Sequence, residues 1–476
     1  MSQPTVADLQ PFDTPAPTRS AAELARLRHA DQGALWKPFT QMAGYALETP
    51  LILAEGKGNW LRDIEGRVFL DGVSSLWVNV HGHSHPRIVE AVRTQLDTLD
   101  HATMLGPSTL PAIELAERLV QIAPGEGLLS RVFYSDSGST AVEIAVKMAY
   151  QYFAQHRDPA QQERNVFVTL SNAYHGDTLG SVSVGGIDLF HQVYAPLLFK
   201  TEQAPGPDPF HRAFGRDPAV HEAECLEALR TIFERRGGAV AALIMEPLMQ
   251  GAAGMLRHSE DFLARAAALA RAHGALLILD EVATGFGRSG TMFACEQAGV
   301  VPDLLCLAKG ITGGVLPLAA TMATEEVYSG FLGEHSEYRT FFHGHSYTGN
   351  PLACAAAIAS LDVFEEERTL EKLSLRLAQL GPRLESLAEH PHVGDIRRLG
   401  VMTGIELVAD RSSGAPFAPS LRVGNRVIEA AMERGVLLRP LGDVVVLMPP
   451  LSITESELDL LCDVTAASID SVTASL

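Results

Sequence analysis

Two charged residues stand at the ends of two apolar segments, and their types suit covalent catalysis. Asp280 ends the run Ala275-Leu-Leu-Ile-Leu-Asp280, and Lys309 follows the run Asp303-Leu-Leu-Cys-Leu-Ala308. Both runs read as buried strands. An ammonium at the end of a buried strand is poorly solvated, so its neutral amine becomes easier to populate. Taken alone, such a lysine can equally be a surface residue whose apolar stem lies along the protein.

A buried amine and a buried carboxylate, each at the end of a strand, together suit one cofactor. Pyridoxal phosphate needs a lysine for its Schiff base and an acid that keeps its ring nitrogen protonated. Lys309 would supply the amine and Asp280 the acid. The pair therefore predicts a pyridoxal phosphate site, provided that the chain also holds the phosphate group.

A phosphate site is indicated at Asp136-Ser137-Gly138-Ser139, which follows the apolar run 132–134 and opens a helical pattern. Small residues let backbone N–H groups approach an anion closely, and the N-terminus of a helix attracts negative charge. Asp and Ser also cap helices that bind nothing, so this segment alone leaves both interpretations open.

A further candidate segment is Asn172-Ala-Tyr174-His175-Gly-Asp177, which follows the apolar run 165–170. An aromatic side chain there can lie flat against a pyridine ring, and Tyr174 and His175 are the candidates. Asp177 could orient a substrate or a neighbouring side chain. A turn with a buried tyrosine would explain the same residues.

The segment Gly285-Phe-Gly-Arg288-Ser-Gly290 matches the G-x-G-x-x-G pattern of dinucleotide-binding loops. Two carboxylates, Asp280 and Glu281, precede it, it lies deep in the chain, and no helical pattern starts inside it. These features argue against a nicotinamide cofactor. Arg288 is better suited to meet an anionic group of a substrate, although a surface arginine would fit as well.

Histidines gather in His81-Gly-His83-Ser-His85 and in His343-Gly344-His345. The second group has no cysteine or carboxylate at the spacing of metal ligands, and the first reads as a turn that leads into Pro86. We therefore predict no metal site. Hydroxyl and backbone donors make the loop 342–351 better suited to a phosphate group.

The composition is that of a soluble enzyme and excludes several partners. The chain has 476 residues, of which 46% are hydrophobic and 20% charged, and its formal net charge of -20 argues against nucleic acid and anionic membranes. No apolar run reaches the roughly 18–20 residues that a membrane span needs. The five cysteines form no C-x-x-C pair, which favours a reducing cytoplasm over a disulfide framework or a zinc site.

Alternating strand and helix patterns from about residue 86 predict an α/β fold with a mostly parallel sheet covered on both faces. The expected strands are 132–134, 165–170, 240–245, 275–280 and 303–308, and the expected helices include 139–153, 223–235 and 259–273. A long amphipathic helix at 369–388 and a capping box at Thr454 and Glu457 are expected near the C-terminus.

The same patterns suggest how the chain is divided. Residues 80–345 would form the large cofactor-binding domain, and residues 21–79 and 346–476 would together form a small α+β domain. Residues 1–20 have neither the basic start nor the apolar stretch of a signal peptide, so we expect a disordered leader.

With these segments in order, the chain resembles the class III pyridoxal-phosphate aminotransferases of fold type I, most closely those of biotin biosynthesis. The resemblance extends from about residue 30 to about residue 465. Its most specific parts are Leu35-Trp-Lys-Pro-Phe-Thr-Gln-Met42, Asp71-Gly-Val-Ser-Ser-Leu-Trp77, Tyr174-His-Gly-Asp177, Asp280-Glu-Val-Ala-Thr-Gly-Phe-Gly-Arg288, Lys309 and residues 343–350.

The resemblance implies a role for each matching residue. The catalytic residues would be Lys309, which binds the cofactor and moves a proton, Asp280 at the ring nitrogen, and Tyr174. The other implied cofactor contacts are Ser137, Gly138, His175, Val282, His345 and Ser346. The implied substrate contacts are Phe39, Leu76, Trp77, Tyr174, Asp177, Arg288, Gly344 and Arg439. Because His345 and Ser346 would come from a neighbouring subunit, the resemblance implies a homodimer with shared active sites.

The implied reaction is a ping-pong transfer of nitrogen from a donor amine to the ketone of 8-amino-7-oxononanoate, which yields 7,8-diaminononanoate. Arg439 would meet the carboxylate of this acid. Adenosylmethionine is the expected donor, but Leu76 and Phe39 stand where the members that use it have an aromatic residue and a tyrosine. Similar variations occur in members that use L-lysine, so L-lysine remains an alternative donor.

Two other functions fit the sequence less well. An ω-amino acid:pyruvate aminotransferase would share the cofactor site but not the segments around Trp36 and Trp77. A cofactor-binding regulatory domain would be expected to carry a DNA-binding module, and the acidic charge of the chain opposes that reading.

Overall fold

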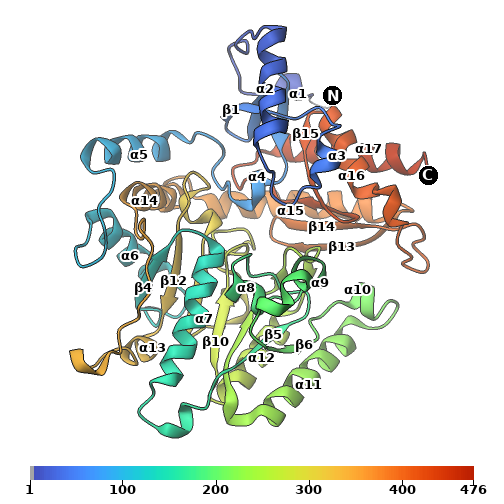
Figure 1. The fold of residues 1–476 in the computed structure, drawn as a ribbon. Coiled ribbons are helices and arrows are strands. Elements are labelled where there is room, and N and C mark those ends of the chain that lie inside the picture. The colour runs from blue at the N-terminus through green and yellow to red at the C-terminus, as the bar shows by residue number, and fades with distance from the viewer. Residues whose placement is uncertain (1–4) are drawn as a thin grey trace.

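A seven-stranded sheet lies at the centre of residues 5–476, the part of the chain that the computed structural model describes (Figure 1). Its strand order is β4-β12-β11-β10-β7-β5-β6. The strands are β4 (Arg131–Ser135), β5 (Val166–Leu170), β6 (Glu202–Ala204), β7 (Val240–Met245), β10 (Leu276–Asp280), β11 (Leu304–Leu307) and β12 (Ala319–Ala323). Neighbouring strands are parallel except at β12, which runs antiparallel to β4 and β11. The predicted mostly parallel sheet is therefore confirmed.

The central strands are buried on both faces. Leu243 and Leu277 belong to one apolar cluster, whereas their sequence neighbours Ile244 and Ile278 belong to another on the opposite face. Strands covered by helices on both sides need such continuous apolar sequences. The covering helices are α6 (Leu110–Ile122), α11 (Pro218–Arg236), α12 (Glu260–Ala272) and α14 (Pro351–Glu366) with the first cluster, and α7 (Gly138–Ala154) with the second.

Both ends of the chain build a smaller α+β domain, as predicted. Strand β3 (Val68–Asp71) pairs in parallel with β15 (Val436–Leu437) and so joins the two chain ends. Glu457 strengthens this connection, because its carboxylate accepts hydrogen bonds from Trp60 Nε1 at 2.6 Å and from Asn59 Nδ2 at 2.8 Å. The same carboxylate completes the predicted capping box at the start of α17 (Glu455–Thr473).

The remaining elements are shorter or belong to the small domain. Its sheets contain β1 (Leu53–Lys57) and β2 (Trp60–Asp63), and β13 (Val393–Leu399), β14 (Met402–Leu407), β16 (Arg439–Leu441) and β17 (Val444–Leu447), with α15 (Thr369–Ala388) and α16 (Val423–Glu433) packed against them. Elsewhere lie α2 (Ala21–Ala34), α3 (Met42–Tyr45), α4 (Ser74–Trp77), α5 (Pro86–Thr98), α8 (Leu179–Ser183), α9 (Asp188–His191), α10 (Pro209–Arg212), α13 (Glu325–Ser329), β8 (Met249–Gln250) and β9 (Leu256–Arg257).

The expected disordered leader over residues 1–20 is ordered at residues 6–12, whereas residues 13–20 form no helix or strand and are mostly exposed; residues 1–4 lie outside the described residues. Residues 6–9 form the short helix α1 (Val6–Leu9). Val6, Leu9 and Phe12 pack against the apolar cluster of the small domain, and the guanidinium of Arg62 lies 4.4 Å from the centre of the Phe12 ring. Three apolar residues at spacings of three are enough to dock the segment, although the polar residues between them conceal this pattern in the sequence.

One domain boundary also differs from the expectation. Helix α14 was assigned to the small domain, but it packs against α5 and α6 beside the central sheet. Its alanine-rich sequence allows close contact with neighbouring helices on several sides, since ten of its residues are buried. The small domain therefore resumes after α14, with α15. Within residues 5–476, no helix combines the length and apolarity needed to cross a membrane.

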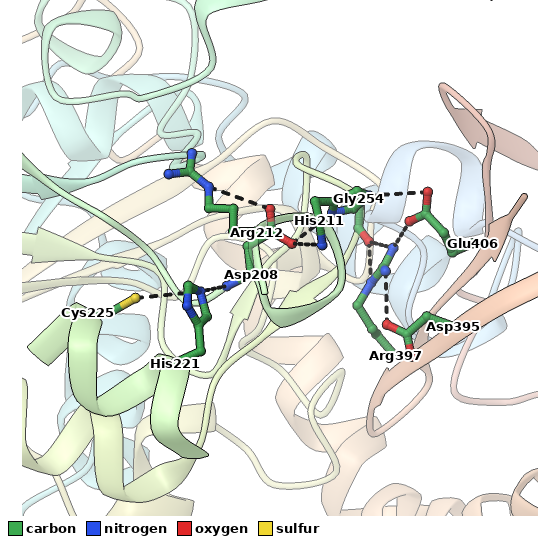
Figure 2. Close-up of polar contacts among 9 residues, drawn as sticks. All are labelled: Asp208, His211, Arg212, His221, Cys225, Gly254, Asp395, Arg397 and Glu406. Atoms are coloured by element: carbon green, nitrogen blue, oxygen red, sulfur yellow. Dashed lines mark hydrogen bonds and ion pairs between the residues drawn. The ribbon is translucent and has the colours of Figure 1, made fainter. Parts of the chain in front are cut away.

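A polar cluster joins the two domains at α10 and β14 (Figure 2). His211 Nδ1 lies 2.7 Å from Asp208 Oδ1, and His211 Nε2 lies 3.4 Å from Glu406 Oε1 in β14. Hydrogen bonding to Asp208 and to Glu406 raises the pKa of His211 to about 9. The imidazole is therefore protonated at neutral pH and connects a carboxylate of each domain.

Replacing His211 by glutamine should destabilise the protein at about pH 6 but hardly at about pH 10. Because its pKa rises from 6.5 to about 9 on folding, the stabilisation is complete below 6.5 and is lost as the pH rises through about 9. The ring is 43% exposed. Solvent screening therefore limits the expected difference to about 1 kcal/mol. Urea unfolding of the parent and of His211→Gln across this pH range tests the prediction, and a pH-independent difference would contradict it.

Candidate active site

A cavity of about 700 Å³ opens at the carboxyl ends of the parallel strands. This volume lies in the range of small-molecule sites, and the edge is where ligands bind in open α/β sheets. Residues from several strands line the cavity, among them Asp136, Ser137, Gly138, Tyr174, His175, Asp177, Glu246, Asp280, Val282 and Lys309, together with Trp77 from the small domain. The structure thus brings together most of the residues that the sequence predicted for one site.

Lys309 follows β11 at the floor of the cavity. Its backbone has a φ of 45°, a left-handed conformation that turns the chain sharply into a short helical turn. Burial lowers the pKa of the Lys309 amine, against the opposing effect of Asp280 and Glu246. Its Nζ lies 5.0 Å from the centre of the Trp77 ring. The amine is therefore held near an aromatic face and is easier to deprotonate than a surface lysine.

Asp280 ends β10 and is only 5% exposed. Its Oδ2 lies 2.7 Å from His175 Nδ1, and its Oδ1 accepts a hydrogen bond of 3.0 Å from the backbone N–H of Val282. His175 is itself buried, and its second ring nitrogen has no protein partner among the described residues. The carboxylate is thus fixed in orientation at the cavity wall.

The N-terminus of α7, where the sequence predicts a phosphate site, lies at the cavity. Ser137 is the N-cap residue of this helix, and its side chain accepts from the backbone N–H of Thr140. A Cβ added to Gly138 would lie 2.5 Å from Val282 Cγ1, so only glycine lets the helix terminus approach the loop after β10 so closely. Ser137, Gly138 and Val282 all line the cavity, so this helix terminus lies at the cavity wall.

These residues fit pyridoxal phosphate. A poorly solvated amine at Lys309, an oriented carboxylate at Asp280 and a glycine-containing helix terminus at Gly138 line one cavity. An amine, a carboxylate and an anion-binding helix terminus are the groups that the aldehyde, the ring nitrogen and the phosphate of that cofactor require.

Tyr174 lies on the other side of the cavity, in the loop after β5. Its hydroxyl donates a 2.9 Å hydrogen bond to Asp177 Oδ2, and its ring stacks on His191 at an interplanar angle of 14°. Burial raises the pKa of the Tyr174 phenol, which therefore stays protonated. Phe190 contacts the Tyr174 ring edge-on, and Phe39 contacts Phe190 in the same way at 5.5 Å. An aromatic row thus leads from the N-terminal segment to the cavity.

Glu246 is a cavity residue that the sequence interpretation missed. Glu246 directly follows the buried strand β7, just as Asp280 ends β10. Asp280 was predicted because it is a charged residue at the end of an apolar run, and the same criterion would have identified Glu246. Its carboxylate accepts backbone N–H groups of Tyr174 at 3.1 Å and of Gly251 at 3.0 Å. Burial raises the pKa of Glu246 to about 7. Glu246 therefore holds two loops of the cavity wall, and its carboxyl is easier to protonate than a surface glutamate.

The segment at α4 forms the wall opposite the strands. Ser74, Ser75 and Trp77 all have positive φ angles, which fold this segment tightly. Leu76 is 49% exposed, whereas Trp77 is buried and lines the cavity. Phe39, which the sequence also assigned to the substrate site, is 60% exposed and meets the cavity only through the aromatic row.

Arg288 does not lie where the sequence interpretation placed it. It is 1% exposed, and its guanidinium donates to Ser74 Oγ and to the carbonyl oxygens of Asn79 and Pro449. Burial lowers the pKa of Arg288 to about 10. The Arg288 donors are used by Ser74, Asn79 and Pro449, so we correct the expectation that Arg288 meets an anionic substrate.

Four other predicted site residues do not line this cavity in the single chain. Arg439 is half-buried on β16. Two residues earlier, the carbonyl oxygen of Leu437 accepts a hydrogen bond from the backbone N–H of Gly72, which lies close to α4 in the sequence. Gly344, His345 and Ser346 lie in the loop before α14, with His345 Nδ1 2.6 Å from Asp136 Oδ2.

The histidines near residue 83 serve separate structural roles. His81 contacts Ser360, His83 contacts Asp71, and His85 contacts Glu367. Within residues 5–476, no group of three or more His, Cys, Asp or Glu side chains is arranged to hold a metal ion.

Comparisons with known proteins identify the family of the chain. The family model Aminotransferase class-III matches residues 42–469. The adenosylmethionine-8-amino-7-oxononanoate aminotransferase of Nitratidesulfovibrio vulgaris is 55% identical over 457 residues, which are 96% of this chain and 84% of that protein. The solved structure of the same enzyme from Methanocaldococcus jannaschii is 43% identical, with a TM-score of 0.88 over 94% of this chain and 99% of that one.

Another similar structure is an amine transaminase from an uncultivated Pseudomonas species, solved in its PLP-bound form. It is 36% identical to this chain, with a TM-score of 0.84 over 92% of this chain and 98% of that one. Transaminases with different substrates therefore share this fold.

Replacing Gly138 by alanine should weaken retention of pyridoxal phosphate about tenfold, which corresponds to about 1.4 kcal/mol. The new methyl group would collide with Val282 Cγ1 at 2.5 Å and push the helix terminus away. Dialysis followed by absorbance of the remaining cofactor measures the effect. Val282→Ala serves as the control, and the double variant should recover part of the retention because the collision partner is gone. Unchanged retention in Gly138→Ala would contradict the phosphate assignment.

Proposed function

The chain belongs to the class III aminotransferases, which are pyridoxal-phosphate-dependent transaminases, and we propose that it transfers an amino group to 8-amino-7-oxononanoate. The product would be 7,8-diaminononanoate, an intermediate of biotin biosynthesis. The observation that carries this proposal is the 55% identity, over 96% of the chain, to a protein named for that substrate. The same name belongs to a relative with 51% identity from Geobacter sulfurreducens.

The cofactor site supports the transamination chemistry. Pyridoxal phosphate, when bound, supplies an aldehyde that takes up an amino group and a ring that accepts electrons. Ser137 and Gly138 would hold its phosphate, and Val282 would pack against its ring. Asp280 would keep a proton on the ring nitrogen, in an orientation that His175 and the Val282 N–H fix.

Lys309 and Tyr174 would handle protons and position the substrate. Because burial lowers the pKa of Lys309, its Nζ can take a proton from the carbon that carries the amino group and return it. Tyr174 stays a neutral phenol beside the cavity and donates to Asp177.

The far end of the substrate requires a cation. 8-Amino-7-oxononanoate ends in a carboxylate, and a guanidinium forms paired hydrogen bonds with such a group. Arg439 is half-buried and no ion pair or hydrogen bond of its side chain is present among the described residues. We therefore propose Arg439 as the carboxylate-binding residue, in place of Arg288, whose donors are already used.

Adenosylmethionine is the proposed amino donor, because the similar proteins carry it in their names. Leu76 and Phe39 favour L-lysine as the alternative. Leu76 offers no aromatic face for an adenine ring, and Phe39 offers no hydroxyl. Both side chains are about half exposed near the cavity, where a donor would enter.

We also propose a homodimer with shared active sites, in the cytoplasm. His345 and Ser346 would reach the phosphate of the partner's cofactor, since neither lines the cavity of its own chain. All five cysteines are free and buried, which suits a reducing compartment.

Adding adenosylmethionine to the cofactor-loaded protein should bleach its visible absorbance, because the donor's nitrogen is transferred to the cofactor. A parallel sample receives L-lysine, and Lys309→Ala serves as the control that should not respond. Subsequent addition of 8-amino-7-oxononanoate should restore the absorbance. Bleaching by L-lysine alone would assign the alternative donor, and bleaching by neither would contradict the proposed function.

Replacing Leu76 by tryptophan should lower the KM for adenosylmethionine relative to that for L-lysine. An indole at this half-exposed position would add a stacking surface, which we expect to be worth about 1 kcal/mol, or about fivefold in relative kcat/KM. Steady-state kinetics with each donor measure the shift, and Leu76→Met controls for side-chain size. Equal effects on both donors would exclude Leu76 as a determinant of donor choice.

A further inference from the structure

The loop 251–255, between β8 and β9, forms part of the cavity wall. Ala252 lines the cavity, and the Gly251 N–H donates to Glu246 at 3.0 Å. A Cβ on Gly251 would lie 3.2 Å from Trp77 Cζ3, so the backbone of the loop rests against the indole ring. The position of this loop therefore sets the position of Trp77 and of the Glu246 carboxylate.

The loop is a tight turn with little internal freedom. The backbone N–H groups of Gly254 and Met255 donate to the carbonyl oxygen of Gly251 at 3.3 and 3.0 Å. A displacement of Gly254 is therefore transmitted to Gly251, one turn away, and from there to the cavity wall.

Arg397 of the small domain holds this turn from outside the cavity (Figure 2). Its Nε and Nη2 both donate to the carbonyl oxygen of Gly254, at 3.0 and 2.8 Å. Arg397 is 8% exposed and does not line the cavity. A guanidinium can chelate one carbonyl oxygen with two donors, which an ammonium cannot reproduce.

Two carboxylates orient the Arg397 side chain. Nη2 donates to Glu406 Oε2 at 2.6 Å, and Nη1 donates to Asp395 Oδ2 at 3.1 Å. Glu406 in turn faces His211 of the large domain. The guanidinium is therefore fixed before it meets the loop, and its direction is set by the small domain.

Strand β14 supplies a second contact behind the loop. A Cβ on Gly404 would lie 2.8 Å from Met255 Cβ and 3.0 Å from the Gly254 carbonyl oxygen. The loop thus packs directly on the backbone of β14, and the hydrogen bonds from Arg397 hold it there.

We propose that Arg397 is a positioning residue of the active site. Its two hydrogen bonds to the Gly254 carbonyl oxygen fix the positions of Trp77 and of the Glu246 carboxylate. Arg397 touches neither the cavity nor a reacting atom, and it acts through the loop 251–255 alone. This inference rests on the proposed aminotransferase function only for its kinetic readout.

The test compares Arg397→Lys with Arg398→Lys in the cofactor-loaded protein labelled with 5-fluorotryptophan. Arg398 is the matched control, because it lies on the same strand and donates to the carbonyl oxygen of Leu377, away from the loop. The chain has three tryptophans, so the fluorine spectrum should contain three resonances that single Trp→Phe variants assign. We expect Arg397→Lys to shift or broaden the Trp77 resonance and to leave those of Trp36 and Trp60 in place.

Steady-state kinetics supply the second readout. Arg397→Lys should raise the KM for the amino donor about tenfold and change kcat less, because the cavity wall is displaced directly and the reacting groups only through it. Arg398→Lys should change neither parameter. An unmoved Trp77 resonance in Arg397→Lys, or an equal shift in Arg398→Lys, would overturn the proposal, as would a fall in kcat at constant KM.

Gly404→Ala covers the case in which Arg397→Lys fails to fold. Its methyl group would push Met255 and the Gly254 carbonyl without removing any charge, and it should move the same Trp77 resonance. If the parent protein did not act on the proposed substrate, the kinetics would give no information. The Trp77 fluorine resonance would still show whether Arg397 positions the cavity wall.

Discussion

Desolvation of charged groups at one edge of the central sheet is the constraint on which the site depends. Strands β7, β10 and β11 are apolar along their length and deliver Glu246, Asp280 and Lys309 to a single cavity. Each charge loses water there, and each is compensated differently. Asp280 gains His175 and a backbone N–H, and Glu246 gains two backbone N–H groups. Lys309 lies 5.0 Å from the centre of the Trp77 ring, and the nearby carboxylates of Asp280 and Glu246 offset only part of the cost of its burial, so the pKa of its amine is lowered.

The two domains contribute different residues to the cavity. The residues that would hold the cofactor stand on the large sheet and on α7, whereas Trp77, Leu76 and Arg439 come from the small domain. The small domain is in turn tied to the large one through buried polar contacts, such as Arg288 to the carbonyls of Asn79 and Pro449. Cofactor and substrate groups can therefore be altered separately, because different elements position them.

The sequence predicted what depends on local pattern and missed what depends on distant partners. Lys309, Asp280 and Gly138 could be found because each follows or ends a recognisable apolar run. Strand β12 escaped prediction, since Ala319-Ala-Thr-Met-Ala323 has neither the bulk nor the alternation of a typical strand and is defined by its two neighbours. The burial of Arg288 could not be inferred, because its carbonyl partners lie more than 150 residues away along the chain.

Choice of substrate must then reside in few residues. The backbone is shared with an amine transaminase at a TM-score of 0.84 and with an 8-amino-7-oxononanoate aminotransferase at 0.88, so the fold itself does not discriminate. In the roles proposed for them, the strand-end residues would serve any transamination and would not discriminate either. What remains is the wall formed by α4, the loop 251–255 and the aromatic row from Phe39 to Tyr174. Since Arg397 and β14 hold that loop from outside, selectivity in this fold can change through small-domain residues that never meet a substrate.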